Sequence, residues 1–163
     1  MSVLVSAASR HGATAEIAEA IDRTLRGRGI ETDLRAPAEV ADLAGYHAVV
    51  LGSAVYMGRW LEEARLLVEE HAALLAARPV WLFSSGPVGD PLKPDEDPVD
   101  VADVVTSTGA RGHRVFPGRI DRGRLRFAEK AVVLALRVPD GDFRDWAAIE
   151  DWANGIADDL AAG

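Results

Sequence analysis

Six consecutive residues have the types and spacing that a phosphate site requires. In chain order they are Ser9, Arg10, His11, Gly12, Ala13 and Thr14. Hydroxyl groups can donate to phosphate oxygens, and a glycine lets the backbone approach them closely. An apolar run precedes this phosphate loop (residues 9–14) and an amphipathic pattern follows it, so the free N–H groups of a helix would point at the loop. The same pattern suits a plain strand-to-helix turn with a Ser or Thr cap, and both interpretations stay open.

Two further segments contain residues suited to holding a planar ring. The second loop (residues 52–58) carries Tyr56 between small or flexible neighbours. Its ring can stack on a heterocycle, or it can simply cover the start of a helix at Trp60. The third loop (residues 84–90) offers two serine hydroxyls and glycines that permit a tight path, although it can equally be only a turn.

Composition excludes several classes of protein. The 163 residues are expected to form one domain. They contain no cysteine, which excludes disulfides and thiolate chemistry, and the four histidines lack the spacing of metal ligands. A net charge of −8 argues against nucleic-acid binding. There is no apolar run of about 18 residues and no signal peptide, so we expect a cytoplasmic protein without a membrane span.

The apolar pattern alternates between strands and helices along the whole chain. It predicts strands at residues 3–7, 30–34, 48–51, 80–83 and 113–116, and helices at residues 13–28, 60–75, 97–108 and 143–160. This order is typical of an α/β fold with a three-layer, doubly wound parallel sheet of five strands. Such sheets bind ligands at the carboxyl ends of their strands, where all three loops would lie.

The chain resembles flavodoxin-fold proteins, and most closely the menaquinone-dependent protoporphyrinogen dehydrogenases. The shared motifs are Ser-Arg-x-Gly-x-Thr in the phosphate loop, Gly-Ser-x-x-Tyr-x-Gly in the second loop, Pro-Gly-Arg at residues 117–119 and the pair Asp145-Trp146. The resemblance covers nearly the whole chain and implies a flavodoxin-like strand order of 2-1-3-4-5. It also implies FMN as the cofactor.

The same resemblance implies which residues hold FMN. The phosphate loop would bind the phosphate, the second loop one side of the flavin and the third loop its outer edge. Beyond the six residues of the phosphate loop, this set contains Ala54, Val55, Tyr56, Met57, Gly58, Ser84, Ser85, Gly86, Pro87, Val88 and Gly89.

The chain departs from the usual flavodoxin pattern at three places. His11 stands where a threonine is usual and Ala13 where an asparagine is usual, so two side-chain donors have changed. Arg10 can compensate through a charge-assisted contact to the phosphate, or it can point into solvent. The third loop lacks the tyrosine that stacks on the outer flavin face, which would leave room for a substrate.

A basic, apolar insertion at about residues 118–142 separates the fifth strand from the last helix. Between residues 118 and 137 six basic residues oppose two acidic ones, a net charge of +4. If this segment is helical, one narrow face carries Arg122, Arg126, Lys130 and Arg137. Such a helix suits peripheral contact with anionic lipid on the inner membrane face, or a lid over a lipophilic substrate. A core helix with a solvated stripe and a dimer contact are the alternatives.

Two functions remain open from the sequence. One is an FMN-dependent oxidoreductase that passes reducing equivalents between a lipophilic donor, such as a porphyrinogen, and a quinone. The other is a flavodoxin-like electron carrier or binding module with weak or absent FMN. No side-chain acid or base is implied, because the flavin performs the redox chemistry. A homo-oligomer is compatible with either function.

Overall fold

A parallel sheet forms the middle layer of the protein. The computed structural model describes residues 2–10, 12–56, 59–86, 101–116, 119–120, 141–142 and 144–162. The five long strands are β1 (Ser2–Ala8), β2 (Glu31–Arg35), β3 (Ala48–Tyr56), β5 (Val80–Ser85) and β6 (Gly112–Phe116). Their order is β2-β1-β3-β5-β6, and every neighbouring pair is parallel. The predicted doubly wound sheet and its order 2-1-3-4-5 are therefore confirmed.

Three short strands add to this sheet and its surroundings. The strand β4 (Arg59–Trp60) pairs antiparallel with the end of β3 and is the sixth strand of the sheet. The strands β7 (Arg119–Ile120) and β8 (Gly141–Asp142) pair with each other. They are the only described part of the basic insertion, and Arg122, Arg126, Lys130 and Arg137 lie outside the described residues.

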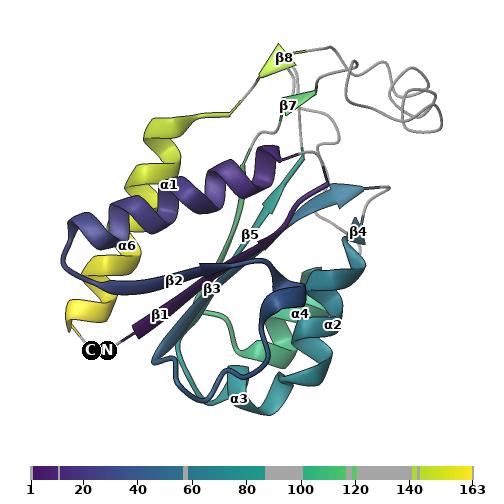
Figure 1. Ribbon diagram of the computed structural model, residues 1–163, viewed down its shortest axis with the longest axis vertical. Coiled ribbons are helices and arrows are strands. Elements are labelled where there is room, and N and C mark those ends of the chain that lie inside the picture. The colour runs from purple at the N-terminus through teal and green to yellow at the C-terminus, as the bar shows by residue number, and fades with distance from the viewer. Residues whose placement is uncertain are drawn as a thin grey trace.

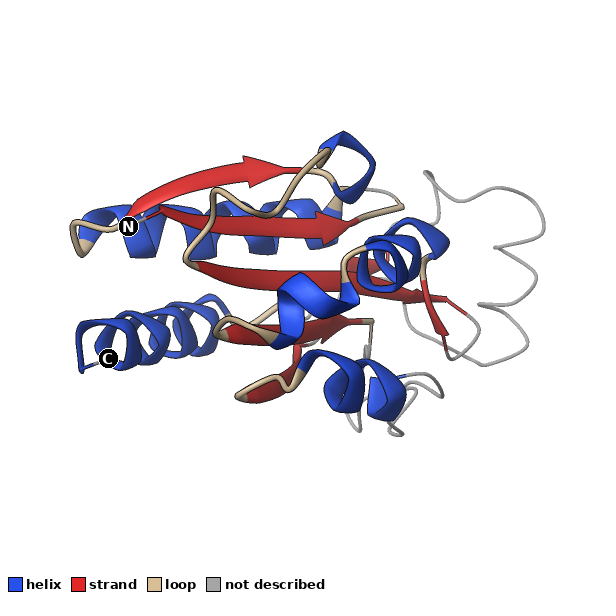
Figure 2. Cartoon of the chain, turned by 90° about the horizontal axis from the view of Figure 1, so that it is seen from below, coloured by secondary structure: helices blue, strands red, loops and turns tan. Residues whose placement is uncertain are grey.

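Helices cover both faces of the sheet (Figures 1 and 2). On one face lie α1 (Ala13–Gly27) and α6 (Trp146–Ala162), which run side by side. On the other face lie α2 (Glu62–Glu70), α3 (Ala72–Ala76), α4 (Val101–Thr108) and the 3-10 turn η1 (Pro37–Glu39). None of the helices in the described parts of the chain is both long and apolar enough to cross a membrane.

The inner strand β1, which lies between β2 and β3, supplies side chains to both layers of the core. Val3 and Val5 belong to the cluster under α1 and α6, whereas Leu4 belongs to the cluster under the other helices. All three side chains are fully buried. Burying each one contributes about 1.5–3 kcal/mol. The near-continuous apolar run of this segment thus follows from helices on both faces of a parallel strand.

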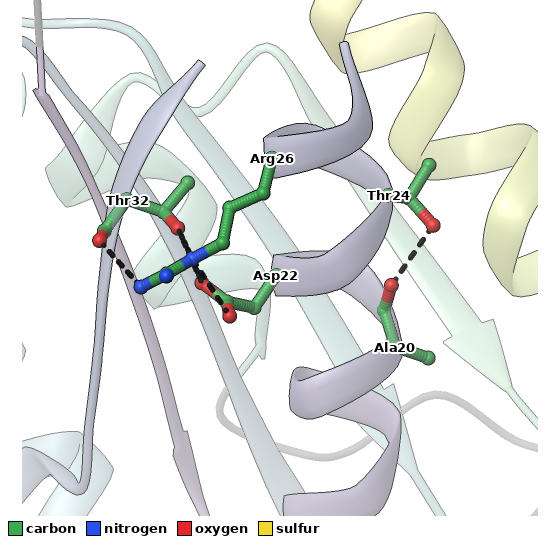
Figure 3. A network of polar contacts seen from close by, with 5 residues as sticks. All are labelled: Ala20, Asp22, Thr24, Arg26 and Thr32. Atoms are coloured by element: carbon green, nitrogen blue, oxygen red, sulfur yellow. Dashed lines mark hydrogen bonds and ion pairs between the residues drawn. The ribbon is translucent and has the colours of Figure 1, made fainter. Parts of the chain in front are cut away.

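A polar network fastens the edge strand β2 to α1 (Figure 3). The Thr32 hydroxyl donates to Asp22 Oδ1. Arg26 donates from Nε to Thr32 Oγ1 at 2.8 Å and from Nη2 to the Thr32 carbonyl at 3.0 Å. Asp22 and Thr32 are both buried, so the network satisfies polar groups that would otherwise be costly there.

Several predicted helix boundaries need correction. The helix predicted at residues 60–75 is two helices, because the His71 backbone leaves the helical region (φ −122°, ψ 22°) and ends α2. Trp60 precedes them and lies in β4. Residues 97–100 lie outside the described residues, and helix α4 occupies the remainder of the third prediction. The last helix begins at Trp146, where the Asp145 carboxylate accepts the Ala148 N–H at 3.1 Å.

Candidate functional site

The phosphate loop joins β1 to α1 with a left-handed backbone at Gly12. Its φ of +88° is strained for any residue with a side chain, and no atom of the part of the chain that the structure describes lies within 4 Å of where a Cβ would stand. The Gly12 N–H donates to Ser9 Oγ at 3.0 Å, which fixes the turn. Gly12 is also the N-cap residue of α1, and no side chain of the described residues caps the helix. His11 lies outside the described residues.

The first turn of α1 offers backbone donors to an anion. Within the described part of the chain, the N–H groups of Ala13, Thr14 and Ala15 have no acceptor. The first hydrogen bond of the helix is the one that the Glu16 N–H donates to the Gly12 carbonyl at 3.1 Å. These groups carry the positive end of the helix dipole. The Thr14 side chain is buried in the same turn. An open cradle with uncapped N–H groups fits a phosphate group.

The second loop is mostly strand, which corrects the prediction. Residues 52–56 continue β3. Residues 52–54 pair with β1 or β5, whereas Val55 and Tyr56 pair with Trp60 and Arg59 of β4. Gly52 and Ala54 have low strand propensity, but Gly52 pairs with both β1 and β5, and Ala54 pairs with β5. Ala54, Val55 and Tyr56 are half-buried at the carboxyl end of β3. Met57 and Gly58 lie outside the described residues.

A direct contact joins the first two loops. The guanidinium carbon of Arg10 lies 4.3 Å from the centroid of the Tyr56 ring, the geometry of a cation–π contact. Arg10 is exposed, and this contact directs its side chain toward the end of β3. The structure thus brings together two residues that the sequence assigned to different ends of the cofactor.

The serines of the third loop also belong to a strand. Ser84 and Ser85 are the last residues of β5, and both are buried. Ser84 Oγ accepts the indole N–H of Trp60 at 2.8 Å and lies 2.8 Å from Nε2 of His113. The Ser84 hydroxyl is therefore hydrogen-bonded inside the protein. Through Trp60 it links β5 to the hairpin of β3 and β4. Pro87, Val88 and Gly89 lie outside the described residues.

Gly86 makes the close approach at the end of β5. A Cβ at this position would lie 3.2 Å from the Cβ of Val55. The Gly86 N–H donates to the Phe116 carbonyl at 3.4 Å. The carboxyl ends of β3, β5 and β6 are therefore held together at this point.

Three residues that shape this edge of the sheet were not predicted from the sequence. Trp60 and His113 form the Ser84 network, and Arg144 reaches the first turn of α1 from the other end of the chain. A buried indole N–H needs an acceptor, which is a signal for Trp60. Nothing in the local sequence points to Arg144, because its contact partner Ala13 is 131 positions away.

Comparison with solved structures identifies the fold. The chain is similar to an archaeal flavodoxin (TM-score 0.67, 16% identity, 99% of each chain covered) and to a flavodoxin of Streptococcus pneumoniae TIGR4 (TM-score 0.61, 19% identity, 99% of each chain covered). It is also similar to rubredoxin oxygen:oxidoreductase of Desulfovibrio gigas (TM-score 0.65, 15% identity), where the match covers 99% of this chain and 36% of that one.

Sequence comparison identifies the family. No curated protein matches the chain. The family model described as a flavodoxin domain matches residues 4–145, which is most of the chain. The chain therefore belongs to the flavodoxin domain family.

Proposed function

We propose that the protein binds FMN at the carboxyl ends of β1, β3 and β5 and carries reducing equivalents on it. The observation that supports this most is the uncapped N-terminus of α1 behind Gly12, because it offers several N–H donors and an open cradle to a phosphate. Bound FMN would supply one- and two-electron redox chemistry, which no side chain can provide.

The residues of the site divide the binding between them. The N–H groups of Ala13, Thr14 and Ala15 donate to the phosphate, and Arg10 adds a positive charge beside it. The ring of Tyr56 provides an aromatic face for the flavin. Gly86 sets the spacing between the ends of β3 and β5, and the Trp60–Ser84 hydrogen bond holds the hairpin in place.

Backbone N–H groups would provide more of the hydrogen bonds to the phosphate here than in typical flavodoxins. His11 and Ala13 replace residues whose side chains usually donate to phosphate, so the helix N–H groups and Arg10 have to compensate. FMN should then bind more weakly than in typical flavodoxins and should depend more strongly on ionic strength.

We further propose a lipophilic donor, such as a porphyrinogen, and a quinone as the acceptor. The motif resemblance to the protoporphyrinogen dehydrogenases supports this reaction, as does the basic, apolar composition of the insertion at residues 118–142. A lipophilic substrate with carboxylates matches both properties of that insertion.

A staged experiment separates the proposed activities. The purified protein is examined for flavin absorbance and then titrated with FMN; failure to bind FMN would refute the proposed function. The FMN-loaded protein is reduced without oxygen and mixed with a soluble quinone, with or without protoporphyrinogen. Rapid catalytic turnover supports the oxidoreductase, whereas a single slow reoxidation supports the electron carrier. Deletion of residues 118–142 should reduce turnover more than FMN affinity.

A further inference from the structure

Arg144 places a buried positive charge against the first turn of α1. Its Nη1 donates to the Ala13 carbonyl at 3.3 Å and lies 3.4 Å from Glu16 Oε2. The guanidinium carbon lies 4.6 Å from the ring centroid of Trp146. Ala13 belongs to the phosphate loop, so this side chain connects the start of α6 directly with the proposed phosphate site.

The burial of Arg144 sets it apart from other paired arginines. Its side chain is 4% exposed, whereas Arg26 and Arg28 in their ion pairs are 58% and 39% exposed. Removing a guanidinium from water is costly unless charge and hydrogen bonds compensate. Glu16, the Ala13 carbonyl and the Trp146 ring supply that compensation.

Glu16 gives this arrangement a consequence for anion binding. Its carboxylate lies in the first turn of α1, where a negative charge interacts favourably with the helix dipole. The same charge opposes a phosphate dianion at the adjacent loop. A cation held beside Glu16 removes most of that repulsion and leaves the N–H groups of the turn available to the phosphate.

We infer that Arg144 is a positioning residue for the phosphate end of the flavin site: it neutralises Glu16 and holds the first turn of α1 in the geometry that receives the phosphate. This inference rests on the proposed function. It predicts that removing the charge of Glu16 restores the FMN affinity that is lost without Arg144. It also predicts that the affinity for riboflavin, which lacks the phosphate, does not depend on the Arg144–Glu16 pair.

A double-mutant cycle tests the inference through the dissociation constants of FMN and riboflavin. We expect Arg144→Gln to weaken FMN binding by about tenfold and riboflavin binding by less than about twofold. Glu16→Gln alone should leave FMN binding equal or tighter. The double variant should recover most of the lost FMN affinity, because the negative charge of Glu16 is then absent as well.

A matched control removes another contact between the same two helices. Arg28 donates to Asp158 at 2.5 Å and to Asn154 Oδ1 at 3.0 Å, both in α6. Arg28→Gln should leave the ratio of the FMN and riboflavin constants unchanged. Thermal unfolding of each variant shows whether it is folded. If Arg144→Gln is not folded, Arg144→Lys takes its place, with an expected FMN-specific loss of about threefold because lysine lacks the planar fork.

Three outcomes would overturn the inference. Equal losses for FMN and riboflavin in either Arg144 variant would show a general packing role. Failure of Glu16→Gln to rescue Arg144→Gln would show that neutralisation is not the cause. If the unmodified protein binds neither flavin, the proposed function fails and takes this inference with it, whereas tight wild-type binding with an unaffected Arg144→Gln refutes the inference alone.

Discussion

The guanidinium of Arg10 lies over the ring of Tyr56, 4.3 Å from its centroid, and so links the phosphate loop with the end of β3. A cation–π contact at such a site contributes about 0.5–1 kcal/mol. In the proposed complex, Arg10 would contact both the ring of Tyr56 and the phosphate of FMN, and so would join the two loops that hold the cofactor.

Loss of the Arg10 charge should weaken the binding of FMN more than the binding of riboflavin. We expect Arg10→Gln to lower FMN affinity by about three- to tenfold, because a charge-assisted contact to the phosphate disappears. Flavin fluorescence titrations measure both constants. Tyr56→Phe is the control, since it retains the aromatic face and should change FMN affinity by less than about twofold. An equal loss of affinity for FMN and riboflavin in Arg10→Gln would contradict a contact between Arg10 and the phosphate.

Two buried serines should respond oppositely to alanine. Ser84 Oγ accepts the Trp60 indole N–H, so Ser84→Ala leaves a buried donor unpaired and should lower the free energy of unfolding by about 1–3 kcal/mol. Ser6 Oγ is buried without a hydrogen-bond partner among the described residues, so Ser6→Ala should raise that free energy by about 0.5–1 kcal/mol. Urea unfolding measures both. A similar change in the two variants would contradict this explanation.

Two glycines should also respond oppositely. A Cβ on Gly52 would lie 2.2 Å from Cζ of Phe83, whose ring packs against Phe116 and Trp152. Gly52→Ala should therefore lower the free energy of unfolding by about 2 kcal/mol or more. Gly155 lies exposed inside α6 with nothing within 4 Å of a Cβ, so Gly155→Ala should raise it by about 0.5–1 kcal/mol. A tolerated Gly52→Ala would mean that Phe83 can move aside.

The local sequence predicts the order of the elements better than their ends. The apolar runs predict every long strand, because burial on both faces leaves a continuous signal in the inner strands and an alternating one in the edge strand β2. The order of the sheet followed instead from the resemblance to flavodoxin-fold proteins. The ends of β3 and β5 consist of residues such as Gly52, Ala54 and Ser84, which have weak strand propensity. Their strand state comes from pairing with neighbouring strands, which local sequence does not encode.

The site was predictable only where its residues are close in sequence. Gly12 and Thr14 stand next to a strand and a helix whose patterns are clear, and so the turn between β1 and α1 was predicted correctly. The Arg144 contact depends on how α1 packs against α6, and the Ser84 contact depends on a hairpin that was read as a loop and a helix. Contacts between residues so far apart in the sequence can be predicted only when the fold is known.

In the proposed complex, the first turn of α1 receives the phosphate of FMN. Nitrogen-15 spectra of the protein, recorded during titration with FMN and separately with riboflavin, test it most directly. We predict that the amide signals of Gly12, Ala13, Thr14 and Ala15 shift strongly with FMN and only slightly with riboflavin. Unchanged signals for these amides on saturation with FMN, or equal shifts with both flavins, would contradict the assignment.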